Sequence, residues 1–348
     1  MGDYPRILVA GAGPSGLSCA YWGAKKGYDI TVFESNDKLS VKPCGELIPR
    51  ETLRYTPFSS RAPWILNKVE RGIVYYKGKY VRELRVDSLK GYTIDKRAFL
   101  EELAERAKTL GAKIRLGEKV TYNGLRKMGF DLAVDATGYR QNLARAAGLD
   151  YPTKKHVVTM QGYCKGKLES GAVVLNFYEK GYAWLFPRGD IVNFGVGGFY
   201  SKKMLEKILE DNLKIYGLKL LSSPAPILTT VELLGGPIKK IRKGKLVVVG
   251  EAAGAVLSTT GEGIRFALWS GSICLRENYE RLFWRGYGKR LRFAGKLLNM
   301  VLKMSDEERF ELLKRGSPNL QAKLLEGIRP SIKDLITIPW LLRYLGKL

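Results

Sequence analysis

Histidine is almost absent from this sequence, which has one, His156, among 348 residues, and glutamine is also scarce. A single histidine rules out most histidine-based metal sites and argues against a Ser-His-Asp triad, because both need an imidazole at a fixed place. We therefore expect no metal site, and we expect proton transfer to rely on other groups. Few glutamines and histidines beside plentiful Lys, Arg and Glu are typical of a thermophile.

Cysteine is also rare, and the few copies do not pair in sequence. The chain contains Cys19, Cys44, Cys164 and Cys274. They form no CxxC motif, and their spacing fits no zinc site. Together with the lack of a secretory signal, this predicts a reduced, cytoplasmic compartment. We expect three of the four to be buried in helices or strands, whereas Cys44 follows Pro43 in a predicted loop, where a structural role is harder to explain.

Long apolar runs are missing, with one exception. Residues 7–24 are uncharged, a length that imitates a membrane span or a signal sequence. The stretch contains a glycine-rich turn and Pro14, and no basic segment precedes it. We therefore predict a strand, a turn and a buried helix here, and a chain that is not an integral membrane protein.

Acidic residues are outnumbered: 34 Asp and Glu face 59 Lys and Arg, which gives a net charge of +25. A basic surface favours acidic partners such as phosphate-bearing cofactors, anionic lipid surfaces or nucleic acid. The charge is spread along the chain and no nucleic-acid-binding module is recognisable, so we expect no nucleic-acid partner. Basic amphipathic stretches around 284–303 and 333–348 are compatible with peripheral contact to a membrane surface.

A glycine-rich turn links the first predicted strand, residues 6–10, to the first helix. In Gly11-Ala-Gly13-Pro14-Ser15-Gly16, the first glycine allows the tight turn, the second lets the backbone approach a pyrophosphate, and the third lets the helix pack on the strand. The helix N-terminus then offers N–H groups and a positive dipole to phosphates. The second strand ends in Glu34-Ser35, where a carboxylate binds a ribose hydroxyl pair. The turn predicts a dinucleotide but does not separate FAD from NAD.

Three later segments favour FAD, which is long and needs contacts beyond the first unit. They are Asp135-Ala-Thr137-Gly138, Gly250-Glu251 and Gly261-Glu-Gly263-Ile264. Glu251 can accept a ribityl hydroxyl, and amides at a helix start near 261–264 can stabilise negative charge on a reduced flavin. A second GxGxxG unit for NAD(P)H is missing, so the electron donor is either transiently docked NAD(P)H or a protein such as ferredoxin, which the basic surface would suit.

The coarse pattern predicts an α/β fold. We expect a Rossmann-like FAD-binding domain with an inserted antiparallel-sheet substrate domain and a helical C-terminal region. Residues 72–87 show hairpin alternation and residues 156–200 are almost all strand, whereas residues 40–60 show no periodicity and are predicted as loop. The expected domains are 1–60, 90–150 and 240–275 for FAD binding, 61–89 and 151–239 for the β-rich substrate domain, and 276–348 for the helical region.

The flavin motifs in this order resemble the p-hydroxybenzoate hydroxylase-type flavoprotein fold, and within it the chain resembles the geranylgeranyl reductase family. The specific marks are Lys42-Pro-Cys44-Gly45-Glu46 and Tyr182-Ala-Trp184-Leu-Phe186-Pro187, which Gly195-Val-Gly197 follows. The resemblance covers roughly residues 5–275. It departs at Gly250-Glu251, where the family usually has Gly-Asp, and the C-terminal region matches nothing recognisable.

The resemblance implies an archaeal enzyme of isoprenoid lipid biosynthesis that reduces C=C bonds of geranylgeranyl chains by hydride transfer from reduced flavin. An isolated alkene has no carbonyl to polarise, so positioning in a dry pocket must carry most of the rate. Cys44 and Gly45 are then catalytic candidates, with Cys44 beside the flavin to protonate or orient the substrate. The candidate substrate-binding residues, which as readily form plain sheet core, are Tyr182, Trp184, Phe186 and Pro187.

Two other functions stay open at this stage. A flavin monooxygenase of the same fold would hydroxylate an apolar or aromatic substrate, and substrate-dependent O2 consumption would identify it. A non-catalytic FAD-bearing, membrane-associated protein would bind liposomes without substrate-dependent reoxidation of the flavin. We favour the reductase because the cysteine loop and the YxWxFP stretch are more specific than the flavin motifs.

Overall fold

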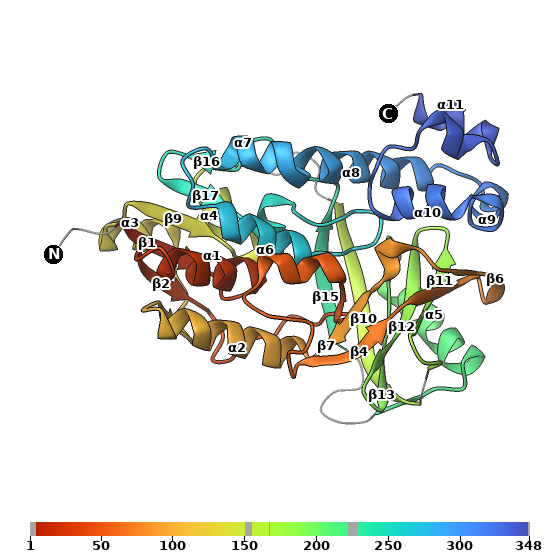
Figure 1. Cartoon of the computed structure of the whole chain (residues 1–348), viewed down its shortest axis with the longest axis horizontal. Helices are drawn as coiled ribbons and strands as arrows, with labels where there is room; N and C mark the ends of the chain where they lie inside the picture. The colour runs from red at the N-terminus through yellow and green to blue at the C-terminus, as the bar shows by residue number, and fades with distance from the viewer. Residues whose placement is uncertain (1–4, 150–154, 167, 222–227, 347–348) are drawn as a thin grey trace.

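The computed structural model describes residues 5–149, 155–166, 168–221 and 228–346. This part of the chain consists of a mainly parallel sheet with its helices, a large mixed sheet, a small three-stranded sheet and a C-terminal group of helices (Figure 1). Within these residues, no helix combines the length and the apolar character that a membrane crossing requires.

The first sheet is the one that the glycine turn predicts. Its strands follow the order β16-β17-β9-β1-β2-β8. β1 pairs in parallel with β2 and β9, and β9 pairs in parallel with β17. The carboxyl ends of these strands therefore meet at one edge, where doubly wound folds bind ligands. The bounds are β1 Arg6–Ala10, β2 Asp29–Phe33, β8 Lys113–Arg115, β9 Leu132–Asp135, β16 Arg242–Lys243 and β17 Leu246–Val248.

Helix α1 (Pro14–Ala24) is the buried helix predicted from the uncharged stretch, and nearly all of its residues are inaccessible. It packs against α2 (Lys96–Thr109) and α6 (Ile264–Ile273). A Cβ on Gly271 would overlap the carbonyl oxygen of Ser15, so α6 and α1 touch backbone to backbone. This contact brings the 261–264 segment beside the first glycine turn. Two short helices, α3 (Tyr122–Met128) and α4 (Asn142–Ala146), complete the unit.

The large sheet runs β14-β10-β13-β12-β11-β5-β6, with β15 also paired to β10. The hairpin predicted at 72–87 is β5 and β6, and α5 (Lys202–Ile215) packs on β10 and β13. β5 and β11 pair in parallel, so the antiparallel pairing predicted for this sheet does not extend to these two strands. No hairpin joins these two strands, because they come from separate insertions. The bounds are β5 Arg71–Tyr76, β6 Lys79–Leu84, β10 Lys155–Lys165, β11 Ala172–Tyr178, β12 Gly181–Arg188, β13 Ile191–Gly198, β14 Lys219–Leu220 and β15 Leu228–Leu234.

The small sheet corrects the loop predicted at 40–60. Its order is β3-β7-β4, with β3 at Leu47–Pro49, β4 at Ile65–Val69 and β7 at Gly91–Ile94. A 3-10 helix follows β3 over Arg50–Tyr55. Three residues are too few to show a period of two, which explains why the sequence pattern misses β3.

The C-terminal region is helical, as predicted. Its helices are α7 (Tyr279–Phe283), α8 (Lys289–Val301), α9 (Asp306–Arg315), α10 (Pro318–Leu325) and α11 (Leu342–Leu345). α7 and α8 run along one side of the molecule, and α2 lies along the opposite side (Figure 1). The apolar face of α8, including Leu291 and Leu297, is buried within the fold. That face is therefore unavailable to a membrane, although its amphipathic pattern is what made 284–303 a candidate for membrane contact.

Candidate functional site

The glycine turn folds tightly against the end of β9. Gly11 has a φ of +102°, and its N–H donates to the carbonyl of Phe33 at 2.7 Å. A Cβ added to Gly11 would overlap the carbonyl oxygen of Ala136. A Cβ added to Gly16 would overlap the carbonyl oxygen of Gly11. Gly13, in contrast, has no atom near its Cβ position. The turn therefore leaves open space above the N-terminus of α1, beside Pro14, where a phosphate can approach backbone N–H groups.

Glu34 lies at the end of β2 beside this turn, as the fingerprint predicts. One carboxylate oxygen accepts the N–H of Ala12 at 2.9 Å, and the other accepts the backbone N–H of Asn36 at 3.0 Å. The hydroxyl of Ser35 donates to the same carboxylate at 3.3 Å. Glu34 is thus held in one orientation at the edge of the turn.

Asp135 is placed differently from the prediction, which listed it as a cofactor contact. Its side chain is fully buried and accepts the hydroxyl of Thr137 at 2.6 Å and the N–H of Ala144 at 2.6 Å. Burial raises the pKa of Asp135, and the hydrogen bonds from Thr137 and Ala144 oppose that rise. The carboxylate braces the turn from behind, and the turn itself presents Thr137 and Gly138 at the sheet edge.

Four predicted segments converge at Glu251. Its carboxylate accepts Lys42 Nζ at 2.8 Å and would lie 3.2 Å from a Cβ on Gly138. Gly250 has a φ of +60°, and its own Cβ would approach Ser15 Oγ at 2.5 Å. The structure thus joins the first turn, the β9 turn, the 250–251 junction and the cysteine loop. Sequence analysis named Glu251 without its partner Lys42, because 209 positions separate the two residues.

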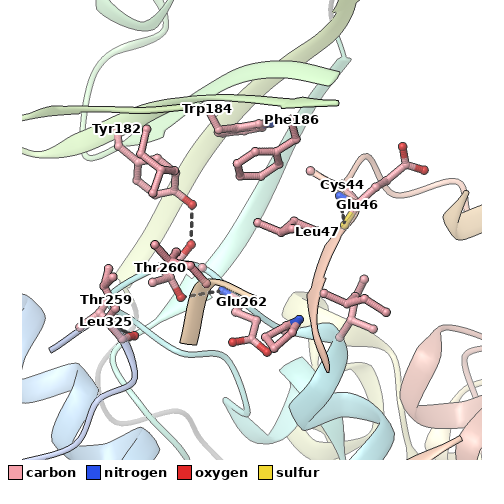
Figure 2. Close-up of a pocket in the computed structure, with 18 of the residues that line it drawn as sticks. Cys44, Glu46, Leu47, Tyr182, Trp184, Phe186, Thr259, Thr260, Glu262 and Leu325 are labelled. Atoms are coloured by element: carbon pink, nitrogen blue, oxygen red, sulfur yellow. Dashed lines mark hydrogen bonds between the residues drawn. The ribbon is translucent and has the colours of Figure 1, made fainter. Parts of the chain in front are cut away.

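A cavity of about 180 Å³ lies between the large sheet and this convergence point. Figure 2 shows the aromatic side chains of β12 on one side of it, with the cysteine loop and the 259–262 segment opposite. The lining residues include Cys44, Gly45, Glu46, Leu47, Leu175, Tyr182, Trp184, Phe186, Thr260, Gly261, Glu262, Gly263, Ile264, Leu325 and Glu326. Both groups of predicted site residues, the 261–264 amides and the aromatic stretch, therefore face the same space.

Strand alternation on β12 decides which motif residues reach the cavity. Tyr182, Trp184 and Phe186 share one face and line the cavity (Figure 2). The Tyr182 hydroxyl donates to the carbonyl of Thr260 at 2.5 Å, which ties the sheet to the 259–264 segment. Pro187 falls on the opposite face and is not a lining residue, so the structure does not bring it to the cavity. The other three form both sheet core and cavity wall.

The glycines after the aromatic stretch have a physical reason in the register of β12 and β13. Trp184 lies directly opposite Gly195, and Tyr182 lies opposite Gly197. A Cβ on Gly195 would overlap the indole ring of Trp184. A glycine is therefore required for the indole to lie flat across the neighbouring strand.

The cysteine loop lies against the same wall. Cys44 is half-buried, and its Sγ accepts the backbone N–H of Glu46 at 3.4 Å. A Cβ on Gly45 would stand 3.1 Å from the ring of Phe186, so any larger residue would require the loop or the ring to shift by a few tenths of an ångström. The three other cysteines are buried, as expected.

A buried ion cluster closes one end of the cavity, and sequence analysis did not anticipate it. Arg265 on α6 is 2% exposed. Its Nε and Nη2 each donate to Glu262 at 2.8 Å. Its remaining partners are Glu51 at 2.8 Å and Glu326 at 2.9 Å. These carboxylates come from segments far apart in the chain, so no local motif announces the cluster.

The carboxylates of this cluster do not share one electrostatic environment. Burial raises the pKa of Glu262, and the charge and hydrogen bonds of Arg265 oppose that rise. Burial also acts upward on Glu51, but the Tyr287 hydroxyl and Arg265 outweigh it and lower the pKa of Glu51. Within the described residues, no group of three or more His, Cys, Asp and Glu side chains is arranged to hold a metal ion.

Comparison with known proteins identifies relatives over the whole length. Residues 9–42 match the NAD(P)-binding Rossmann-like domain family. The digeranylgeranylglycerophospholipid reductase of Methanococcus vannielii is 30% identical in an alignment that covers 82% of this chain and 81% of that protein. The protein of the same name from Methanocaldococcus jannaschii is 27% identical and aligns with 99% of this chain and 98% of its own length.

Solved structures confirm the predicted fold. A geranylgeranyl bacteriochlorophyll reductase-like protein from Thermoplasma acidophilum superposes with a TM-score of 0.83 at 17% identity, covering 99% of both chains. A flavin-dependent brominase superposes with a TM-score of 0.71 at 13% identity, covering 99% of this chain and 100% of that chain. At these identities the likeness establishes the fold, a Rossmann-like unit with further sheets and a helical C-terminal region.

Proposed function

The chain belongs to the family of the digeranylgeranylglycerophospholipid reductases, and on that premise we propose that it saturates C=C bonds of geranylgeranyl chains with FAD as cofactor. The substrates are archaeal-type membrane lipids or their precursors. The observation that carries the proposal is the cavity itself. Its aromatic wall of Tyr182, Trp184 and Phe186 faces the 261–264 segment and Cys44 across one apolar space, which suits an apolar segment of a prenyl chain.

The residues at the sheet edge fit an FAD. The space beside Gly13 is open, the first turn of α1 carries no acidic residue, and Glu34 stands where a ribose hydroxyl pair binds. The space beside Gly263 is also uncrowded, because a Cβ added there would meet only Val256, at 3.6 Å. We infer that Gly11–Gly16 hold the pyrophosphate and that 261–264 border the flavin ring. A bound FAD would supply the hydride.

The chain's own residues then have three tasks. Trp184 and Phe186 are nearly inaccessible to water and hold an alkene in place by shape and exclusion of solvent. Cys44, at the cavity edge, donates a proton from its thiol to the second alkene carbon or orients the chain for that proton. Gly45 lets the loop approach closely enough for the thiol to reach. The electron donor is NAD(P)H or an acidic protein carrier such as ferredoxin, which the net charge of +25 would attract.

Mass spectrometry of the lipid tests the proposal. Dithionite-reduced protein is incubated without oxygen with a digeranylgeranyl glycerolipid, and the product is expected to gain the mass of two hydrogen atoms for each bond reduced. Protein that was denatured before reduction serves as the control. An unchanged mass contradicts the proposal. A gain of oxygen that requires air would identify a monooxygenase instead.

We also propose that the protein contacts the membrane peripherally through a C-terminal aliphatic segment, residues 328–342. Four large aliphatic side chains in this segment are exposed: Ile328, Ile332, Ile336 and Leu342. Ile332 is 79% and Ile336 73% exposed, and they stand at the two ends of a short 3-10 helix, Ile332–Leu335. Exposed Arg329 and Lys333 accompany them, a combination that suits anionic lipid. The segment begins just after Leu325 and Glu326, which line the cavity.

Negative charge introduced into this segment is expected to weaken membrane binding. I332E/I336E should bind vesicles that contain phosphatidylglycerol at least about tenfold more weakly, because two aliphatic side chains no longer enter the interface. Co-sedimentation measures the binding. The matched control is M204E/I215E, which alters two exposed apolar residues on α5. If both double variants lose vesicle binding equally, the change in overall charge, and not the loss of this segment's contact, would explain the effect.

A further inference from the structure

We propose that Asn193, on β13, is a positioning residue that holds the cysteine loop in register with the aromatic wall. Asn193 lies outside the two motifs that mark the site, and it contacts both. Its role in turnover rests on the proposed function, whereas its hold on the loop rests on geometry alone. The two can therefore be tested separately.

The contacts of Asn193 use both ends of its amide. The residue is 1% exposed and pairs across the strands with Phe186. Its Oδ1 accepts the indole Nε1–H of Trp184 at 3.1 Å. Its Nδ2 donates to the carbonyl of Cys44 at 2.8 Å and to Glu46 Oε2 at 3.3 Å. An indole N–H only donates and a carbonyl only accepts, so an amide is the side chain that satisfies both partners at this place.

Glu46 secures the other side of the loop. It adopts a φ of +61°, which is unfavourable for a residue with a side chain, and it is buried. Its carboxylate accepts Arg188 Nε at 2.8 Å and the backbone N–H of Lys96 at 3.1 Å. Arg188 in turn donates to Asp95 at 2.9 Å. These contacts hold Glu46 in its strained conformation and neutralise its charge.

A continuous set of hydrogen bonds therefore runs from the indole of Trp184 to the sulfur of Cys44. Asn193 joins the indole to the loop carbonyl, and the backbone N–H of Glu46 contacts Cys44 Sγ at 3.4 Å. Removing the amide leaves the indole N–H and the Cys44 carbonyl without this partner inside the protein. The buried indole N–H regains a partner by reaching water, which requires the loop to open.

Thiol labelling reports the position of the loop without any substrate. Cys19, Cys164 and Cys274 are buried, so iodoacetamide should modify Cys44 first. N193L, loaded with flavin to the same absorbance as the parent protein, is expected to label about tenfold faster because opening loses fewer hydrogen bonds. Its kcat for prenyl reduction should fall about a hundredfold with a smaller change in KM, since a displacement of about 1 Å suffices for such a loss.

N176L is the matched control. Asn176 on β11 is also fully buried, and it donates to Asn212 at 2.8 Å and accepts the N–H of Gly78 at 3.0 Å. Its partners lie away from the cavity, so N176L should unfold at a lower temperature yet label at the parental rate. If N193L fails to fold, W184F removes the indole N–H together with part of the ring, and it should still accelerate labelling.

Parental labelling rates in the folded N193L protein, or in W184F, would overturn the proposal. Equal acceleration in N193L and N176L would overturn it as well, because general loosening would then explain the effect. Faster labelling in a protein that reduces no prenyl lipid would uphold the role of Asn193 in the loop and contradict the proposed function.

Discussion

G195L is expected to abolish most prenyl reduction while the protein keeps its flavin. A Cβ at position 195 would overlap the indole ring of Trp184 and approach the carbonyl oxygen of Met160 at 2.7 Å. The strand is paired on both sides, so the backbone has little freedom to yield. The indole must therefore leave its place and move into the cavity of about 180 Å³. We expect kcat/KM to fall at least about a hundredfold, because the alkene loses its wall.

V196L is the control for overpacking. Val196 neighbours Gly195 on the same strand but is buried in the core on the other face of the sheet. An added methylene there should cost about 1–3 kcal/mol of stability and leave kcat/KM nearly unchanged. Flavin absorbance, the unfolding temperature and lipid reduction are measured on both variants. Comparable activity losses would show that sheet stability, and not the wall of the cavity, controls turnover.

The parts of the site that the sequence predicts are those set by neighbours along the chain. Gly11, Gly13 and Gly16 act within one turn, so their spacing alone predicts a dinucleotide. The aromatic stretch became a prediction through resemblance, and strand alternation alone could not separate sheet core from substrate wall. In the structure Trp184 faces Gly195 across the strands and also lines the cavity, so its side chain belongs both to the sheet core and to the cavity wall.

The parts that the sequence does not predict depend on contacts across long separations. Lys42 meets Glu251 only after two chain segments converge, and Asn193 meets Cys44 only after the sheet packs on the loop. Amphipathic patterns mislead for the same reason. The apolar face of α8 is filled by its neighbours in the fold, whereas Ile332 and Ile336 remain exposed. Periodicity shows that a face is apolar but not what covers it.

Arg265 provides the largest expected effect on stability. Its guanidinium is 2% exposed and satisfies carboxylates on Glu51, Glu262 and Glu326. R265M keeps much of the side-chain volume. It removes the positive charge that these carboxylates share in an environment largely shielded from water. Removing one partner of a buried ion pair typically costs 3–5 kcal/mol, so we expect a loss of about that size. The unfolding temperature should fall by roughly 5–15 °C.

R97M is the matched comparison, because Arg97 pairs with Glu101 at 2.8 Å on the exposed surface of α2. Such pairs contribute little, so R97M should change stability by less than about 1 kcal/mol. Similar unfolding temperatures for R265M and R97M would refute the assigned role of the cluster.

The pH dependence of R265M gives a second, independent measurement. Burial raises the pKa of Glu262 even beside Arg265, and loss of the guanidinium should raise it further. A carboxyl with a raised pKa in the folded state binds a proton more readily folded than unfolded. The contribution of this carboxyl to stability therefore becomes less unfavourable as the pH falls towards about 4.3, the pKa of Glu in the unfolded chain. The stability deficit of R265M relative to the parent protein should shrink between neutral pH and about pH 5, and a deficit that stays constant would place its origin in lost packing.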